Sequence, residues 1–285
     1  TCRLKTKLFL IPVLGKAGIF SYTDWTGINP LMKREREKIY IYGKHALMEA
    51  LGNAPRAVKK VFLSPEANTS ELRGALEKNK IPFSAMKGGD AGRMVSKDAS
   101  HQGVIAAVDP AEILVNFDDF VSNLKSDGNT ILVLLDELTD PQNVGAIIRS
   151  AVAFGASGVL LPAKNQAPIT GAVVKVSAGM VFRIPIVEVG NVNRAVDILK
   201  EKDFRVYGLE MNGEREISDE KFGAPSLFIV GNEGRGIREK TFERCDVQLR
   251  IPMNPKCESL NASVSAAIVL FYWSLGHPGA LKRNG

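Results

Sequence analysis

Short apolar runs alternate along the chain with stretches in which apolar residues recur at helical spacing. A continuous apolar run is typical of a strand buried on both faces, and helical spacing is typical of a helix with one buried face. Their alternation predicts a layered α/β fold with mainly parallel strands. From residue 130 onward the runs predict strands at Ile131–Leu135, Gly158–Leu161, Arg205–Leu209, Leu227–Val230 and Val247–Ile251. Helices are predicted over the segment that holds Val144, Ile147, Ile148, Ala151 and Val152, and at Ala172–Ala178, Asn193–Glu201 and Asn261–Leu275.

A smaller α/β unit precedes this domain. Its predicted elements are a helix at Gly43–Leu51, a strand at Val58–Leu63, a helix at Ser70–Lys78, and strands at Ile81–Met86 and Val104–Val108. The weakly patterned segment 110–129 contains Pro110 and ends in Ser126-Asp127-Gly128-Asn129, which is typical of a linker, and we expect one short helix in it at Asp118–Leu124. The predicted organisation is an extension at 1–38, a small domain at 39–109, a linker at 110–129 and a large domain at 130–278.

The first 31 residues differ in character from the rest. Leu8–Phe20 is apolar, but Pro12, Gly15 and Lys16 interrupt it, so it is too short and too broken to span a bilayer. Met32 is followed by a run of charged residues and resembles a natural start. We therefore expect residues 1–31 to be upstream sequence outside the fold, and we expect no membrane association.

Composition narrows the function only a little. The chain has 285 residues, 45% hydrophobic and 24% charged, as in ordinary soluble proteins. Lys and Arg number 37 against 31 Asp and Glu, and the resulting net charge of +6 permits a polyanionic partner without requiring one. The three cysteines and three histidines are scattered and form no CxxC pair, so we expect no metal site, no disulfide framework and a cytoplasmic location. Cys257 lies two residues before Ser259 with no histidine adjacent in sequence, which favours an incidental thiol.

Residues Gly231–Ile237, with the sequence Gly-Asn-Glu-Gly-Arg-Gly-Ile, directly follow a predicted strand. The glycines at 231, 234 and 236 have the reverse of the dinucleotide-binding G-x-G-x-x-G spacing, and no Gly-Lys-Ser/Thr of a phosphate loop occurs. These spacings argue against a nicotinamide dehydrogenase. Two interpretations remain open: a tight turn, or a loop whose backbone closely approaches a ligand.

Polar residues also follow two other predicted strands. After Asp140-Pro141, Asn143 is well placed to begin a helix that carries Arg149, whose planar guanidinium suits phosphate. Farther on, Ser259 or Asn261 is expected to cap a helix that is apolar almost all round and so buried, against another subunit or the core. Each pattern has a structural alternative, namely an N-capped helix with a surface arginine and a simple helix cap. Open α/β sheets bind ligands at the carboxyl ends of their strands, which favours function.

Three motifs in this order resemble those of the SpoU/TrmH RNA 2′-O-ribose methyltransferases, a family of the SPOUT superfamily. They are Asp140-Pro141-x-Asn143-x-Gly145-x-x-x-Arg149, then Gly231-Asn232-Glu233-Gly234-x-Gly236-Ile237, and then Ile251-Pro252-Met253 with Ser259-Leu260-Asn261-Ala262-Ser263. The likeness covers about residues 130–275. Ile41-Tyr42-Gly43 with His45, and His101-Gln102-Gly103, also resemble the L30e-like RNA-binding domain of the 23S rRNA guanosine 2′-O-methyltransferase branch.

The resemblance implies a SPOUT-type α/β domain with a mainly parallel sheet and a C-terminal trefoil knot, preceded by the small L30e-like domain. It also implies S-adenosylmethionine as cofactor, RNA as substrate and a homodimer whose active site draws on both subunits. The family pattern assigns the cofactor to Leu209, Gly231, Ile251, Met253, Leu260 and Ala262. It assigns the polar catalytic set to Asn143, Arg149, Glu233, Ser259 and Asn261.

The reaction this implies is the attack of a ribose 2′-hydroxyl on a sulfonium methyl group. Arginine stays protonated in proteins, so we expect Arg149 to grip the target phosphate and to favour ionisation of the adjacent hydroxyl. A phosphate oxygen or water would then take the proton, while Glu233 fixes Arg149 or the loop. The substrate that this resemblance implies is a guanosine of 23S rRNA. The alternatives are a tRNA 2′-O-methyltransferase, an enzyme acting on an rRNA adenosine, and a non-catalytic RNA-binding factor in ribosome assembly.

Overall fold

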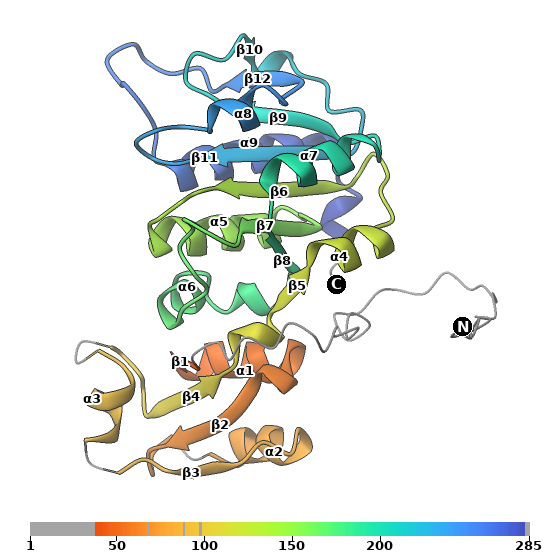
Figure 1. The fold of residues 1–285 in the computed structure, drawn as a ribbon. Coiled ribbons are helices and arrows are strands. Elements are labelled where there is room, and N and C mark those ends of the chain that lie inside the picture. Colours follow the sequence, from red (N-terminus) through yellow and green to blue (C-terminus); the bar gives the residue numbers. More distant parts are fainter. Residues whose placement is uncertain (1–37, 68, 88, 97–98, 283–285) are drawn as a thin grey trace, which may run out of the picture.

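The computed structural model describes residues 38–67, 69–87, 89–96 and 99–282, which form two α/β units (Figure 1). The expectation for residues 1–31 lies outside the described residues. In the larger unit the sheet order is β10-β12-β9-β11-β6-β7-β8-β5, and all neighbouring pairs are parallel. The α/β class with a mainly parallel sheet is therefore confirmed. The trefoil knot stays a prediction, because strand order does not fix the path of the loops.

Every strand predicted for the large domain is present, within a residue or two at each end. The strands are β5 (Leu114–Asn116), β6 (Ile131–Asp136), β7 (Gly158–Pro162), β8 (Ile186–Val189), β9 (Arg205–Leu209), β10 (Arg215–Glu216), β11 (Ser226–Gly231) and β12 (Val247–Arg250). Of these, β5, β8 and β10 were not predicted. They are short strands at or near the ends of the sheet, and the sequence pattern marks them weakly.

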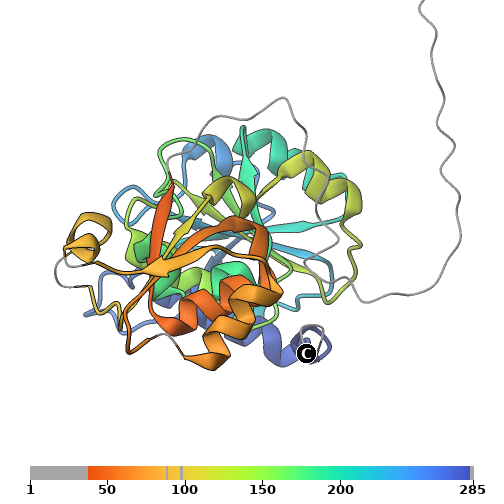
Figure 2. The ribbon, with the colours of Figure 1, turned by 90° about the horizontal axis from the view of Figure 1, so that it is seen from below.

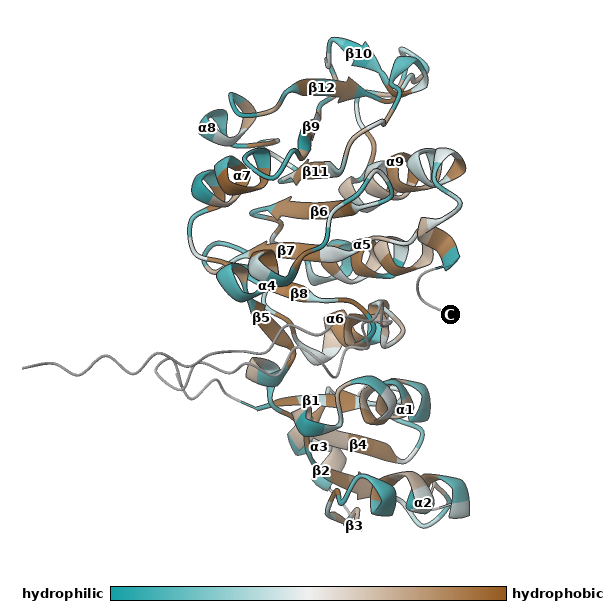
Figure 3. Cartoon of the chain, turned by 90° about the vertical axis from the view of Figure 1, so that its right-hand side faces the viewer, coloured by the Kyte–Doolittle hydropathy of each residue, from teal (hydrophilic) through white to brown (hydrophobic). Residues whose placement is uncertain are grey.

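Helices cover both faces of this sheet (Figure 3). On one face lie α5 (Pro141–Ala153), α6 (Gly171–Val176) and α9 (Ala262–Gly276), and on the other lie α4 (Phe117–Asn123), α7 (Val192–Lys200) and α8 (Glu239–Phe242). Each face has its own cluster of buried apolar residues. Coverage on both sides explains why the central strands read as continuous apolar runs.

The segment 110–129 is more than a connection. Its predicted helix is confirmed as α4, and the Asn116 side chain caps it by accepting from the amides of Asp118 and Asp119 at 2.8 and 3.3 Å. Just before that helix, β5 pairs in parallel with β8 and forms one edge of the large sheet. Part of the predicted linker therefore belongs to the sheet of the large unit.

The small unit contains a mixed sheet, so the expectation of mainly parallel pairing is wrong there. Its elements are β1 (Ile39–Tyr42), α1 (Lys44–Asn53), β2 (Val58–Leu63), α2 (Ser70–Lys78), β3 (Phe83–Ala85), α3 (Asp90–Met94) and β4 (Val104–Val108), in the strand order β1-β4-β2-β3. The last strand, β4, inserts between β1 and β2 and is antiparallel to both, whereas β2 and β3 are parallel. Insertion of a late strand between two early ones leaves no trace in hydrophobic periodicity.

The two units pack closely where β1 and α1 meet α6 and the turn after it (Figure 1), and from below the small unit lies in front of the large one (Figure 2). One buried apolar cluster contains residues of both units, among them Ile41, Leu47 and Phe182. A Cβ on Gly171 would lie 2.1 Å from the Tyr40 carbonyl oxygen. The small unit is thus seated directly on the large one.

Candidate active site

The carboxyl ends of four neighbouring strands bring the sequence motifs to one edge of the large sheet. In register, Gly231 at the end of β11 pairs with Asp136 of β6, and Leu209 of β9 pairs with Leu249 of β12. Ile251 follows β12 directly. Leu209, Gly231 and Ile251, all assigned to the cofactor by resemblance, therefore lie at adjacent strand ends.

The glycine loop, residues 231–238, closes on itself. Asn232 and Gly236 exchange two backbone hydrogen bonds at 3.0 and 2.9 Å, and the Asn232 side-chain oxygen accepts from the amides of Gly234 and Arg235. A Cβ on Gly231 would lie 2.3 Å from the Gly236 carbonyl carbon, and Gly236 has a φ of 69°. The loop is therefore a tight turn, and its first and last glycines serve the turn itself, while its approach to a ligand stays a prediction.

This closure changes what the loop offers to a ligand. The amides of Asn232, Gly234, Arg235 and Gly236 are all engaged within the loop. They are not available as a cradle for an anion. What the loop offers instead is the side chains of Glu233 and Arg235, both of them exposed residues.

Asn143 and Glu233, which are 90 positions apart in sequence, meet directly. The Asn143 Nδ2 atom donates to Glu233 Oε1 at 2.6 Å, and Asn143 is 5% exposed. Asn143 does not begin the helix as expected: α5 starts at Pro141, and the Asp140 carboxylate caps it by accepting from the Gln142 amide at 2.8 Å. Asn143 instead lies in the first turn with its side chain turned inward.

Arg149 lies on the exposed side of α5 and makes no side-chain hydrogen bond or ion pair with any residue that the structure describes. Glu233 was expected to contact either Arg149 or the rest of the loop. Its carboxylate binds Asn143 instead. The guanidinium of Arg149 is thus free to bind a group from outside the chain.

The third motif leads into α9. The Asn261 side-chain oxygen accepts from the Ser263 and Val264 amides at 2.9 and 3.4 Å, so Asn261 is the helix cap, and the cap prediction is confirmed for this residue rather than for Ser259. Ser259 is exposed, Met253 and Leu260 are half-buried, and Ala262 is 9% exposed in the first turn. Capping leaves the Asn261 amide nitrogen without a partner among the described residues, so the cap does not preclude a second role.

Sequence reasoning missed the acidic pair at the end of β6. Asp136 is fully buried and Glu137 is 7% exposed, and both bind Arg238 at the far end of the glycine loop. Burial opposes the charge on Arg238, yet its hydrogen bonds to Asp136 and the charges of both carboxylates raise the pKa of Arg238 above the ordinary value. The available signal was the position of two acids directly after a buried apolar strand, where carboxylates need partners.

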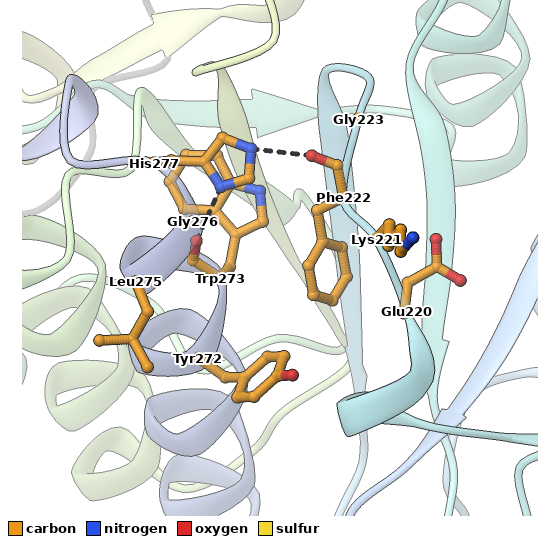
Figure 4. A pocket seen from close by; sticks show the side chains of 9 residues that line it. All are labelled: Glu220, Lys221, Phe222, Gly223, Tyr272, Trp273, Leu275, Gly276 and His277. Carbon is orange, nitrogen blue, oxygen red and sulfur yellow. Dashed lines mark hydrogen bonds between the residues drawn. The ribbon is translucent and has the colours of Figure 1, made fainter.

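The large unit carries two cavities, and one of them borders this framework. One of about 580 Å³ is lined by the acidic pair, Glu210 and the outer side of the glycine loop. The other, of about 440 Å³, lies between the segment that precedes β11 and the last turn of α9. There His277 stacks on Trp273 and contacts the Phe222 carbonyl oxygen at 2.8 Å (Figure 4). Only the first borders the motifs. Across the described ranges, no three His, Cys, Asp or Glu side chains group as metal ligands, and no helix is long and apolar enough to cross a membrane.

Comparison with known proteins decides the family. Residues 130–271 match the SpoU rRNA Methylase family, and residues 40–114 match a family described as RNA 2′-O ribose methyltransferase substrate binding. A 23S rRNA (guanosine-2′-O-)-methyltransferase RlmB of Neisseria meningitidis serogroup B is 34% identical over 232 residues, which are 81% of this chain and 92% of the relative. The chain belongs to the SpoU rRNA methylase family.

Other relatives of this SpoU methylase agree. A protein of the same name from Pseudomonas syringae pv. tomato is 33% identical over 81% of this chain and 93% of its own length. A putative TrmH family tRNA/rRNA methyltransferase of Staphylococcus haemolyticus is 31% identical, over 82% and 94%. The resemblance drawn from the three motifs is thereby confirmed, and the chain is an RNA 2′-O-ribose methyltransferase by family.

Solved structures show the same fold. The SpoU methyltransferase AviRb from Streptomyces viridochromogenes, solved in complex with AdoMet, gives a TM-score of 0.72 at 24% identity and covers 84% of this chain and 89% of its own. An rRNA methyltransferase from Sinorhizobium meliloti gives 0.71 at 21% identity, over 83% and 86%. Both matches extend across the two units and confirm the SPOUT-type fold class.

Proposed function

We propose that this SpoU methylase transfers a methyl group from S-adenosylmethionine to the ribose 2′-hydroxyl of a guanosine in 23S rRNA. The observation that carries the proposal is the meeting of three separated motifs at one sheet edge, with Asn143 held by Glu233 at 2.6 Å and Arg149 left free. The relatives from Neisseria meningitidis and Pseudomonas syringae are named for that reaction. We also propose a cytoplasmic location, where that RNA would be met.

The strand ends suit the cofactor. Leu209 and Ile251 are half-buried apolar side chains that pack on the core, and Met253 and Leu260 are also half-buried. Partly exposed apolar side chains at the carboxyl end of a parallel sheet suit an adenine ring. The residues that would hold S-adenosylmethionine are Leu209, Gly231, Ile251, Met253, Leu260 and Ala262. When bound, it supplies an electrophilic methyl group on a sulfonium.

The polar residues would act on the ribose and its phosphate. A carboxylate can only accept, so the Glu233 contact turns the Asn143 amide nitrogen toward it and leaves the Asn143 carbonyl oxygen to accept from a ribose hydroxyl. Arg149 would grip the target phosphate with two donors, and its charge favours the ionised 2′-hydroxyl. A phosphate oxygen or a water molecule then takes the proton. Ser259 and Asn261 would orient the ribose from the start of α9, and holding the reactants in line supplies much of the rate.

Two measurements test this function. Calorimetry with S-adenosylmethionine is expected to show binding, and RNA from a strain lacking the protein is expected to lose one 2′-O-methylguanosine of 23S rRNA, which the purified protein restores. Loss of a tRNA methyl group instead would favour a tRNA 2′-O-methyltransferase, one of the two activities in the name of the Staphylococcus relative. Cofactor binding without any missing methyl group would support the non-catalytic assembly factor, and absence of both would refute the proposal.

We further propose that the protein is a homodimer joined through α9. This helix packs on α5 with one face and exposes an apolar stripe on another: Val264 is 45% exposed, Phe271 51% and Leu275 62%, with half-buried Ile268 between them. The spacing of four, three and four residues puts all of them on one side of the helix. A second copy on this stripe would lie next to the helix that carries Arg149, as a shared active site requires.

Charge on the stripe should separate the subunits. The double substitution Val264→Glu with Leu275→Glu is expected to give a monomer in light scattering at micromolar concentration, because two carboxylates per chain would be buried without partners. Phe83→Glu, at a 38% exposed apolar residue of the small unit, is the matched control and should leave the mass unchanged. A wild-type monomer, or a dimer that survives the double substitution, would contradict this interface.

A further inference from the structure

The glycine loop is tied to the end of β6 at both of its ends. At its start, Asn232 Nδ2 donates to the Glu137 carbonyl oxygen at 2.8 Å. At its end, the Arg238 amide donates to Asp136 Oδ2 at 3.0 Å, and the Arg238 Nε and Nη2 atoms donate to Asp136 Oδ1 at 2.9 and 2.6 Å. Between these two ties lies Glu233. The loop therefore cannot shift without breaking bonds to a central strand.

Arg238 spans both acids of the pair. Its Nη1 atom donates to Glu137 Oε1 at 2.9 Å while the rest of its fork holds Asp136. Asn165 Nδ2 donates to the same Glu137 oxygen at 3.2 Å, and Arg235 lies 3.7 Å from its other oxygen. The two negative charges are thus matched by two arginines, both of them from the loop.

The backbone at Glu137 supports a positioning role. Its φ is 63°, a left-handed conformation that is unfavourable for a residue with a side chain. Such conformations persist where the surroundings fix them and are concentrated at functional sites. Here the conformation turns the Glu137 carbonyl oxygen to Asn232 and its carboxylate to Arg238, so that one residue secures both ends of the loop.

We propose that Asp136, Glu137 and Arg238 form a clamp that sets the glycine loop and, through it, aims the Glu233 carboxylate at Asn143. These are positioning residues for the proposed methyl transfer, and the inference rests on that function where it speaks of rate. An arginine fork that reaches two carboxylates at once fixes direction as well as distance, which a lysine cannot do. Arg238→Lys keeps the charge that the buried Asp136 needs but breaks the double link.

In kinetics, Arg238→Lys is expected to lower kcat at least about tenfold with little change in KM for RNA, since a displacement of about 1 Å can cost about a hundredfold. The matched control is Arg244→Lys, whose Nε atom binds Asp197 at 3.0 Å on the surface, away from the loop, and which should change kcat less than about twofold. In a Glu233→Ala background, which has no acceptor for Asn143, Arg238→Lys should add little further loss, because both changes disable the same contact.

A readout without chemistry separates the clamp from the reaction. Hydrogen exchange of the Gly234 and Gly236 amides, both bonded to Asn232, is expected to quicken at least tenfold in Arg238→Lys and to stay unchanged in Arg244→Lys. Equal behaviour of the two variants, or fully additive losses of Arg238→Lys and Glu233→Ala, would overturn the clamp. If the wild-type protein neither binds S-adenosylmethionine nor methylates RNA, the proposed function fails while the exchange measurement still decides the clamp. Asp136→Asn is the second variant should Arg238→Lys fold poorly, and it should quicken the same amides.

Discussion

Arg149→Ala is expected to lower methylation of RNA at least about a hundredfold while the affinity for S-adenosylmethionine stays within about twofold, a loss of the size seen when one transition-state donor is removed. Arg149 is exposed on α5 and has no side-chain hydrogen bond or ion pair with any described residue, so its removal costs the fold little. The loss would arise because the target phosphate is no longer held beside the reacting hydroxyl. Single-turnover methylation with saturating cofactor, together with calorimetry, measures both quantities.

The control is Arg194→Ala, at an exposed arginine of α7 on the opposite face of the sheet, and we expect it to keep full activity. Arg149→Lys should fall between the two, since an ammonium keeps the charge and loses the planar fork. Near-normal turnover by Arg149→Ala would remove Arg149 from the proposed mechanism. Equal losses of cofactor affinity and turnover would instead place it in the cofactor pocket.

Gly171→Val is expected to destabilise the protein by about 2–3 kcal/mol or more, because overpacking of a well-packed contact has costs of that order. A Cβ at residue 171 would lie 2.1 Å from the Tyr40 carbonyl oxygen, which is backbone and cannot move aside as a side chain can. The two units would have to separate, which exposes apolar surface of their shared core. Thermal unfolding should show a melting temperature lower by about 5 °C or more.

The matched control is Gly190→Val, because nothing lies within 4 Å of a Cβ built there. RNA binding should weaken in Gly171→Val more than cofactor binding does, since the cofactor residues lie at the strand ends of the large unit. Deleting the small unit, residues 1–110, would test the same dependence less cleanly. It would expose Phe182 and its buried neighbours in the large unit. A Gly171→Val protein as stable as Gly190→Val would show that the units do not depend on this contact.

The large sheet was predictable because its central strands are buried on both faces. Ile131–Leu135 and Leu227–Val230 are continuous apolar runs, and the structure places both in the middle of the sheet. Strands near the ends, such as β5 and β10, have only three and two residues and lie outside such runs. The pattern of apolar residues indicates which strands are buried. It therefore reveals the central strands of the sheet and misses the short strands near its ends.

The sequence was sufficient to predict which residues belong to the candidate site, but not which of them contact each other. The motifs identified Asn143 and Glu233, but only the fold shows that they bind each other rather than Arg149. The closure of the glycine loop was likewise hidden, because an Asn232 side chain that satisfies two backbone amides looks in sequence like any polar loop residue. Asp136 and Arg238 lie 102 positions apart, and no local pattern joins them.

The direct seating of the small unit limits how a methylase of this kind can be redirected to a new RNA. A substrate-binding module on a flexible tether could be exchanged for another without regard to its new neighbour. Here the exchanged module would also have to carry the backbone that meets Gly171 and the carboxylate of Glu49, which binds Arg183 through two hydrogen bonds. Because the two units share one buried core, a change of target is more readily made by side chains on the surface of the small unit than by grafting a foreign domain.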